Sequence, residues 1–287
     1  MAFQKQNYVT RMARKLVRRV RYLLSEDRRR RLNWSPQDRD LEQWSARRLN
    51  RIASFLPQKV SYLEVGVFRG ETISNVKMPV RVGVDPEPRF SVVGLPNGVE
   101  IFASTSDHFF LSHKRAFCFD LIFLDGLHEA KQCYSDFVNV LKISSPDSVI
   151  LIDDVLPDDD ISSIPDQDDS LKERARTGQT GFRWHGDVWK VVVAISIAHA
   201  DARIQIIHSP EMNPVDGDDN PQAAVWRKPG GVLDAEDSAL GFQVIDELEG
   251  KPFSYGVERW PSLFKPVGEK DFLASLQGFF ETKQPKP

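Results

Sequence analysis

The feature that most constrains the fold of this chain is a repeated alternation of short apolar strands and helical segments, which begins near residue 58. Five strands are expected there, at Val60–Val65, Val80–Val84, Val99–Ala103, Phe119–Leu124 and Val149–Ile152. Apart from Asp120 the fourth strand is apolar, as suits a strand covered on both faces, and it leads into a helix from about Glu129 to Ile143. Strand, crossover helix and strand in repetition predict a parallel, doubly wound sheet.

The residues after the fifth strand extend this pattern. A buried helix is expected at roughly Asp187–His199, followed by final strands at Arg203–Ile207 and Ala223–Arg227. The predicted fold class is therefore α/β, with a Rossmann-like, doubly wound sheet of about seven mostly parallel strands. The main domain is expected to span 38–229 and to open with a helix over 38–56. Residues 230–287 are expected to form a mixed C-terminal extension, whose aromatic side chains pack on the core or on a partner subunit.

A polar insertion interrupts the pattern at residues 157–183. It is rich in aspartate and serine and has few apolar residues. A segment of this length and composition after a strand is either disordered or a lid that faces the substrate. Trp184 and His185 follow it directly, and two roles are open for them: stacking on a ring of the substrate, or anchoring the next helix. Trp189, in that helix, is expected in the core.

The N-terminal residues carry a concentration of positive charge. Residues 1–31 hold eleven basic and two acidic side chains, a net charge of +9, whereas the whole chain has a formal net charge of −3. Residues 8–24 have the apolar spacing of an amphipathic helix with an arginine-rich face, so 1–37 is expected to be a basic, helical extension. It packs on the domain or on a partner subunit in a homo-oligomer, or it lies through residues 8–31 on an anionic membrane surface. Nucleic acid is the least favoured partner.

Cysteine usage and hydropathy favour a cytoplasmic protein. The two cysteines, Cys118 and Cys133, do not make a disulfide framework and suit a reducing compartment. There is no apolar run of 18 residues that would predict a membrane-spanning helix. The N-terminus also lacks the uninterrupted apolar stretch of a signal peptide. We therefore expect a cytoplasmic chain, peripheral to a membrane if the basic extension binds lipid.

A glycine-containing turn follows the first strand, in the run Leu63-Glu64-Val65-Gly66-Val67-Phe68-Arg69-Gly70-Glu71-Thr72. Strand, turn and helix in this order let a ligand approach the backbone closely, and the amides of the helix N-terminus can receive a polar group. The middle glycine of the dinucleotide fingerprint is absent, since Phe68 occupies its place. That bulky side chain argues against a pyrophosphate across the turn, and a structural turn without a ligand is the alternative.

An aspartate ends the second strand, in the run Val82-Gly83-Val84-Asp85-Pro86. Asp85 lies 21 residues after Glu64. An acidic side chain in this place can accept both hydroxyls of a ribose, which predicts a bound nucleoside without choosing between cofactors such as NAD and others. The alternative is a turn-forming aspartate before proline.

Acidic side chains also leave the fourth and fifth strands. Asp125 follows Leu124, with His128 three residues on, and Asp153 and Asp154 follow Ile152. If these strands are neighbours, three carboxylates meet at one edge, and a hard, oxygen-liganded cation such as Mg²⁺ would relieve their repulsion. His128 would then be free to act as a base. For the Asp153–Asp154 pair the alternative is a helix cap or a solvated turn.

These motifs, taken with Ser104–Phe110 and with Gly186–Lys190, resemble a family of class I methyltransferases that is known as methyltransferase family 24. The family includes bacterial enzymes that act on sugar hydroxyls of macrolides, such as the macrocin and mycinamicin O-methyltransferases, and of surface polysaccharides. The resemblance covers roughly residues 58–228. It implies that 38–229 is an S-adenosylmethionine-dependent methyltransferase domain.

The resemblance also implies roles for individual residues. The turn Glu64, Gly66, Val67, Phe68, Gly70 and Thr72 would hold the methionine end of the cofactor. Asp85 and Pro86 would hold its ribose, Ser106 and Asp107 would lie near the adenine, and Asp125 would border the cofactor. Asp125, Asp153 and Asp154 match the Mg²⁺ ligands of the macrolide enzymes, and His128 matches their proposed base. Asp153 stands where the family often has Glu or His, a departure that bears on the metal.

The reaction implied is transfer of a methyl group from S-adenosylmethionine to a hydroxyl of a sugar or another small molecule, for example a glycan precursor in polysaccharide biosynthesis. Asp125 and His128 would be the catalytic residues, with Mg²⁺ as a second cofactor. Two rivals remain open at this point: a nucleotide-dependent oxidoreductase on the same sheet, and a non-catalytic scaffold that retains a methyltransferase fold.

Overall fold

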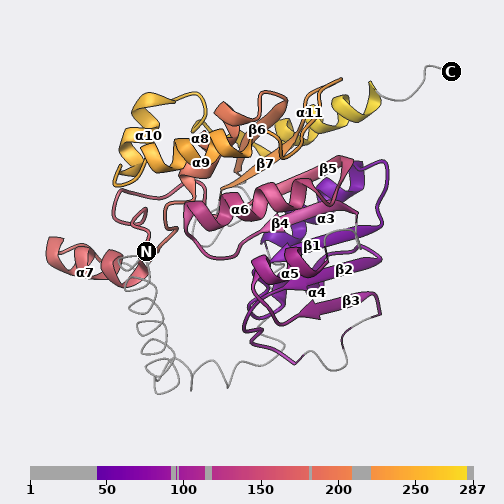
Figure 1. Cartoon of the computed structure of the whole chain (residues 1–287), viewed down its shortest axis with the longest axis horizontal. Helices are drawn as coiled ribbons and strands as arrows, with labels where there is room; N and C mark the ends of the chain where they lie inside the picture. Colours follow the sequence, from indigo (N-terminus) through magenta and orange to yellow (C-terminus); the bar gives the residue numbers. More distant parts are fainter. Residues whose placement is uncertain are drawn as a thin grey trace. The chain divides into compact units, whose positions relative to one another are not determined.

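A computed structural model describes residues 44–91, 95, 97–113, 118–180, 183–208 and 221–282 (Figure 1). The helix expected at 8–24, the basic residues up to 31 and the start of the helix expected at 38–56 lie outside the described residues. What is described of that second helix is α3, Trp44–Phe55. Among the described residues, no helix combines the length and the apolar character that crossing a membrane requires.

Eight strands form one sheet in the order β3-β2-β1-β4-β5-β7-β6-β8. Their bounds are β1 Ser61–Val65, β2 Val80–Val84, β3 Val99–Phe102, β4 Phe119–Leu124, β5 Ser144–Ile152, β6 Ala202–His208, β7 Gln222–Arg227 and β8 Val267–Gly268. Among the described strands β7 alone runs antiparallel to its neighbours. The strand order reverses between β1 and β4, so the sheet is doubly wound, and the predicted Rossmann-like α/β class is confirmed.

The fifth strand begins five residues earlier than the sequence pattern predicts. Ser144 already pairs with Phe119, and a register shift separates this pair from the regular pairing that starts at Leu121 and Val149. Polar residues and Pro146 at the start of β5 hide the strand from a search for apolar runs. The short β8 was not predicted, because two residues carry no periodic signal.

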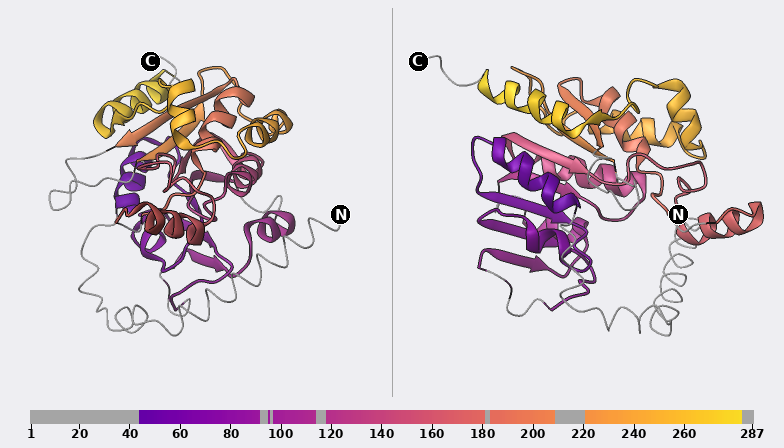
Figure 2. Two further views of the ribbon diagram at one scale, coloured as in Figure 1. Left: turned by 90° about the vertical axis from the view of Figure 1, so that its left-hand side faces the viewer. Right: turned by 180° about the vertical axis from the view of Figure 1, so that it is seen from behind.

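Helices cover both faces of the sheet (Figures 1 and 2). One apolar cluster contains residues of α5 Ser106–Ser112, α6 Ala130–Leu141, α8 Trp189–Ala198, α9 Ser238–Glu247 and α10 Phe253–Arg259. The other contains residues of α3, α4 Glu71–Asn75 and α11 Glu269–Glu281. Successive residues of β1 face opposite clusters, Tyr62 one and Leu63 the other, as the pleat of a strand requires.

Asp120 is a buried acid in the middle of the sheet, and backbone groups satisfy it. Its Oδ2 accepts hydrogen bonds from the amides of Val60 and Ser61, at 3.2 and 3.1 Å, and from the Ser61 hydroxyl. A buried carboxylate with these partners avoids most of the cost of desolvation. Asp120 therefore helps to fix the start of β1 beside β4.

The C-terminal residues pack on the core of the same chain. Trp189, fully buried as predicted, makes edge contacts with Phe253 and Phe264. On the opposite face Phe272 of α11 packs against Trp226 of β7. Glu269 at the start of α11 is buried and pairs with Arg48 and Arg51 of α3. The described part of the C-terminal extension thus contacts the core of its own chain, and packing on a partner subunit stays a prediction.

The 157–183 insertion contains an ordered helix, α7 Gln167–Thr177. Arg174 makes two hydrogen bonds to the Asp159 carboxylate, at 3.0 and 3.1 Å, and Ser162 and Ser170 are buried. The described residues of the insertion therefore include a helix with paired side chains, and the role of the segment as a lid stays a prediction. Figure 1 shows α7 at the left of the view, standing apart from the sheet.

Candidate active site

The turn after β1 touches the turn after β4. Gly66 has a φ of +92°, and a Cβ built there would lie 1.8 Å from the carbonyl oxygen of Asp125. Its amide donates to the Val84 carbonyl at 2.8 Å, and the amide of Asp125 donates to Val65 at 2.8 Å. Only glycine fits this position, because both the backbone angle and the space exclude a side chain. The predicted cofactor turn and the predicted catalytic turn are thus in contact.

Asp85 is bonded to the same glycine turn. Its Oδ2 accepts the amide hydrogen of Phe68 at 2.8 Å, and its Oδ1 accepts that of Glu87 at 2.7 Å. Phe68 has a φ of +46°, which is rare for a bulky residue and marks local strain. Its ring is exposed and has the guanidinium groups of Arg69 and Arg89 each 5.1 Å from its centroid. Two motifs that were read separately in the sequence therefore form one unit.

The remaining residues of the turn differ in what they offer a ligand. Val67 is buried in the core, so only its backbone faces the turn. Gly70 caps α4 and packs against the ring of Phe90. Thr72 is half-buried in the first turn of α4, and Pro86 is exposed after β2.

Glu64 is a buried acid near the end of β1. The Tyr62 hydroxyl donates to its Oε2 at 2.7 Å. Burial raises the pKa of Glu64 well above its usual value, the Tyr62 hydrogen bond opposes this, and the charges of Asp125 and Asp85 add to the rise. A cationic group placed beside Glu64 would therefore be stabilised by it.

Ser106 and Asp107 open helix α5, and α6 holds them in place. The Gln132 side-chain amide donates to Ser106 Oγ at 3.3 Å, to Asp107 Oδ1 at 3.2 Å and to Asp136 Oδ1 at 3.2 Å. Asp136 is buried, and burial raises its pKa to about 7. Gln132 and Asp136 are not among the site residues predicted from the sequence; the available signal was an acid on the apolar face of the helix predicted at 129–143.

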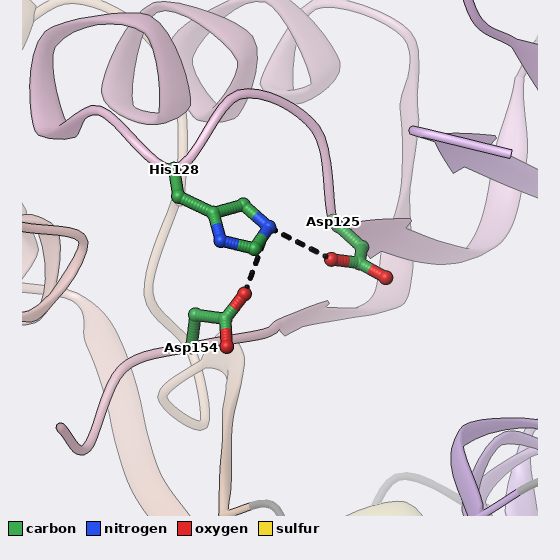
Figure 3. A group of neighbouring side chains, drawn as sticks. All are labelled: Asp125, His128 and Asp154. Atoms are coloured by element: carbon green, nitrogen blue, oxygen red, sulfur yellow. Dashed lines mark ion pairs between the residues drawn. The ribbon is translucent and has the colours of Figure 1, made fainter. Parts of the chain in front are cut away.

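Asp125, His128 and Asp154 form the central cluster (Figure 3). Nε2 of His128 lies 2.9 Å from Asp154 Oδ2 and 3.5 Å from Asp125 Oδ1. One ligand atom from each of the three residues lies within 4.8 Å of the other two. Asp154 has a φ of +57°, so a strained backbone aims its carboxylate at the imidazole.

The charges of this cluster shift one another's protonation. Burial alone would lower the pKa of His128, but Asp154 and Asp125 outweigh it and raise that pKa well above its usual value. Burial raises the pKa of Asp125 to about 6, although the hydrogen bond from His128 opposes the rise. An imidazolium at His128 would therefore lie between the carboxyl groups of Asp125 and Asp154.

Asp153, the third predicted metal ligand, lies outside this group of three. It is buried, and its Oδ1 accepts the amide hydrogen of Asp154 at 2.9 Å. Burial raises its pKa well above the usual value, with Asp125 and Asp154 adding to the rise. The structure therefore gathers His128, rather than Asp153, with Asp125 and Asp154.

Trp184 lies on His128. The two rings are stacked, with centroids 4.9 Å apart and an interplanar angle of 19°. The indole Nε1–H donates to the Ile164 carbonyl at 2.7 Å. His185 is buried, and burial lowers its pKa against the opposing charges of Asp154 and Asp158. The insertion thus brings two aromatic residues to the cluster.

Comparison with known proteins bears on this site. Residues 63–155 match the family described as a methyltransferase domain, methyltransferase family 24. No curated protein sequence matches the chain. Similar solved structures include the O-methyltransferase TomG from Streptomyces achromogenes, in complex with S-adenosylmethionine. It is 16% identical, covering 68% of this chain and 81% of that one, with a TM-score of 0.41.

The plantazolicin methyltransferase BpumL, in complex with S-adenosylhomocysteine and a pentazolic desmethylPZN analogue, is 15% identical. The match covers 73% of this chain and 94% of that one, with a TM-score of 0.48. Cofactor-bound Rv0187 from MTB is 15% identical over 69% and 82% of the two chains, with a TM-score of 0.46. The match of residues 63–155 to this methyltransferase family confirms the resemblance to family 24 and the enzyme class that it implied, an S-adenosylmethionine-dependent methyltransferase.

Proposed function

We propose that this chain is an O-methyltransferase that transfers a methyl group to a hydroxyl of a small molecule, with a sugar or glycan precursor as the acceptor class. One observation carries the proposal: the turn predicted to hold the cofactor, at Gly66, touches Asp125 of the Asp125–His128–Asp154 cluster. A methyl donor and a group that can take a proton from the acceptor would thus lie at one edge of the sheet. The sugar rests on the family resemblance.

The cofactor would lie along the carboxyl ends of β1, β2 and β3. Glu64, beside the glycine turn, would attract the positively charged amino group of the methionine end. Asp85 would accept the ribose hydroxyls, since each of its carboxylate oxygens accepts a hydrogen bond from a backbone amide and can accept a further one. Ser106 and Asp107, held by Gln132, would border the adenine. When bound, S-adenosylmethionine supplies an activated methyl group.

His128 would take the proton of the acceptor hydroxyl. The carboxyl groups of Asp154 and Asp125 raise the pKa of this imidazole and so favour its protonated form in the ligand-free arrangement. A positive charge placed next to Asp125 would weaken that effect and favour the neutral imidazole, which is the form that can act as a base. Asp125 and Asp154 would then orient Nε2 and stabilise the imidazolium that forms.

A divalent cation fits this cluster in part. Asp125 and Asp154 would hold it, while Asp153 lies outside the group of three. Mg²⁺ prefers oxygen ligands, and the third ligand atom gathered here is an imidazole nitrogen. If bound, Mg²⁺ would lower the pKa of the acceptor hydroxyl. We therefore include Mg²⁺ as a second cofactor in the proposal, and its binding is tested by the titration below.

Calorimetric titration with S-adenosylhomocysteine, with and without Mg²⁺, tests cofactor binding. We expect micromolar affinity for the wild-type chain. If Mg²⁺ strengthens binding in the wild type but not in the Asp154→Asn variant, Asp154 is a metal ligand; Asp160→Asn, in the insertion, is the matched control. Absence of binding under both conditions would contradict the proposal and favour the scaffold reading.

Release of S-adenosylhomocysteine in the presence of a panel of hydroxyl acceptors tests the reaction. The panel should contain nucleotide sugars, free glycosides and catechols, so that the acceptor class is decided together with activity. We expect turnover with a sugar hydroxyl. Turnover only with catechols would retain the O-methyltransferase and reject the sugar.

A further inference from the structure

The indole of Trp184 is bonded to the insertion at one end and contacts His128 with its face. Its Nε1–H donates to the carbonyl of Ile164, twenty positions earlier and inside the insertion, and the ring is stacked on that of His128 with centroids 4.9 Å apart. Among the described residues, Trp184 is therefore held at its polar end by the insertion, while its face contacts the predicted base.

The backbone after Trp184 closes on the loop that carries His128. Gly186 has a φ of +66°, and a Cβ built there would lie 1.8 Å from the His128 carbonyl oxygen. Asp187 accepts the amide hydrogen of Ala130 at 2.7 Å, at the start of α6, and pairs with the buried Lys190 at 2.8 Å. The segment 184–187 thus contacts His128 by ring and by backbone.

Hydrogen bonds alone restrain the His128 ring weakly. Its ion pairs with Asp125 and Asp154 both come from Nε2, and Nδ1 is buried without a hydrogen-bond partner among the described residues. A ring held at one nitrogen can still tilt about that atom. A flat aromatic face at stacking distance removes this freedom, and it also attracts the imidazolium form.

We propose that Trp184 is a positioning residue for His128, which holds the imidazole with Nε2 directed at Asp125 and Asp154. The proposal rests on the function proposed above, in which His128 takes the acceptor's proton. It replaces both roles that the sequence left open for Trp184. The polar insertion then supplies a wall of the active site as well as the projecting helix α7.

The experiment compares the variants Trp184→Ala, Trp184→Leu and Trp184→Phe with Trp260→Ala, a matched control in which a half-buried tryptophan of the C-terminal region is lost. NMR of protein labelled with ¹³C in the histidine rings reports on His128, whose signal is identified by its loss in His128→Asn. We expect the alanine and leucine variants to move and broaden this signal, because the indole ring current and the restraint disappear. Phenylalanine should largely preserve the signal.

Kinetics on the best acceptor of the panel give the second readout. We expect kcat to fall by about tenfold or more in the alanine and leucine variants, with KM and the affinity for S-adenosylhomocysteine within about twofold of wild type. The phenylalanine variant should keep at least about a third of kcat. If the alanine variant does not fold, the leucine and phenylalanine variants carry the comparison.

Three results would overturn the proposal. They are an unchanged His128 signal in the leucine variant, an unchanged kcat despite a moved signal, and a raised acceptor KM at constant kcat, which would make Trp184 a substrate-stacking residue. A wild-type chain without turnover would instead refute the proposed function. The NMR comparison would still decide whether Trp184 holds the ring.

Discussion

Two sides of the candidate site meet where Gly66 touches Asp125, and they are built differently. The cofactor side consists of the turns after β1, β2 and β3, where backbone groups dominate: Asp85 binds the amide of Phe68, and Gly66 approaches Asp125 through the main chain. The acceptor side consists of Asp125, His128, Asp154 and the segment 184–187, where side chains from three separate stretches converge. Short sequence motifs therefore set the geometry of the cofactor side. The geometry of the acceptor side depends on how the insertion folds.

Replacement of the predicted base gives the largest expected difference between the two sides. His128→Ala should reduce turnover by about 10²–10⁴-fold, since general base catalysis contributes that much. Affinity for S-adenosylhomocysteine should stay within about threefold, because the cofactor side is untouched. His208→Ala, at the end of β6, serves as the control. Turnover in His128→Ala equal to that in His208→Ala would show that a group other than His128 takes the proton.

Gly66→Ala should damage both sides at once. A Cβ would overlap the Asp125 carbonyl, so we expect a loss of at least about 3 kcal/mol in the free energy of unfolding. Gly178→Ala is the control, since Gly178 has a φ of +70° and nothing within 4 Å of a Cβ. It should cost about 1 kcal/mol from the backbone angle alone. If urea denaturation gave similar losses of unfolding free energy for both variants, the backbone around Gly66 would be able to move aside for a Cβ.

Asp136, on the cofactor side of the site, should make the free energy of unfolding depend on pH. Its folded pKa of about 7 exceeds the ordinary value of 3.8, so the folded chain keeps a proton that the unfolded chain releases. The contribution to stability is then greatest below pH 4 and is lost as the pH rises to about 7. Asp136→Asn should be more stable than wild type by about 2 kcal/mol at pH 8, with a smaller difference at pH 5.

Urea denaturation at the two pH values measures this effect, with the exposed Asp271→Asn as control. A pH-independent difference between Asp136→Asn and wild type would contradict the assignment of the titrating group to Asp136.

The smallest expected effect is on cofactor affinity at Asp85. Asp85→Asn keeps the shape of the side chain but loses one acceptor for a ribose hydroxyl, so S-adenosylhomocysteine should bind about tenfold more weakly, or about 1.4 kcal/mol. Glu87→Gln, an exposed neighbour, should bind normally. Calorimetry that finds no loss for Asp85→Asn would place the ribose elsewhere.

The insertion is where the sequence was least informative. Its composition was compatible with disorder or with a lid. Two roles stayed open for Trp184, because the sequence pattern does not indicate which distant residue an indole contacts. The same limit hid Gln132 and Asp136, whose partners Ser106 and Asp107 lie on another helix. From the sequence, Asp153 was expected to join Asp125 and Asp154 as a metal ligand. In the structure, Oδ1 of Asp153 accepts a hydrogen bond from the amide of Asp154.

The sequence by itself determined the alternation of strands and helices, the place of the glycine turn and the acids that end β2, β4 and β5. These follow from local preferences: apolar runs form buried strands, glycine permits positive φ, and parallel strands end at one edge. Only the tertiary structure decided that His128 joins the carboxyl groups of Asp125 and Asp154, and that Trp184 stacks on the imidazole. These contacts join residues that are distant in sequence, and their geometry depends on how the insertion folds back on β4 and α6.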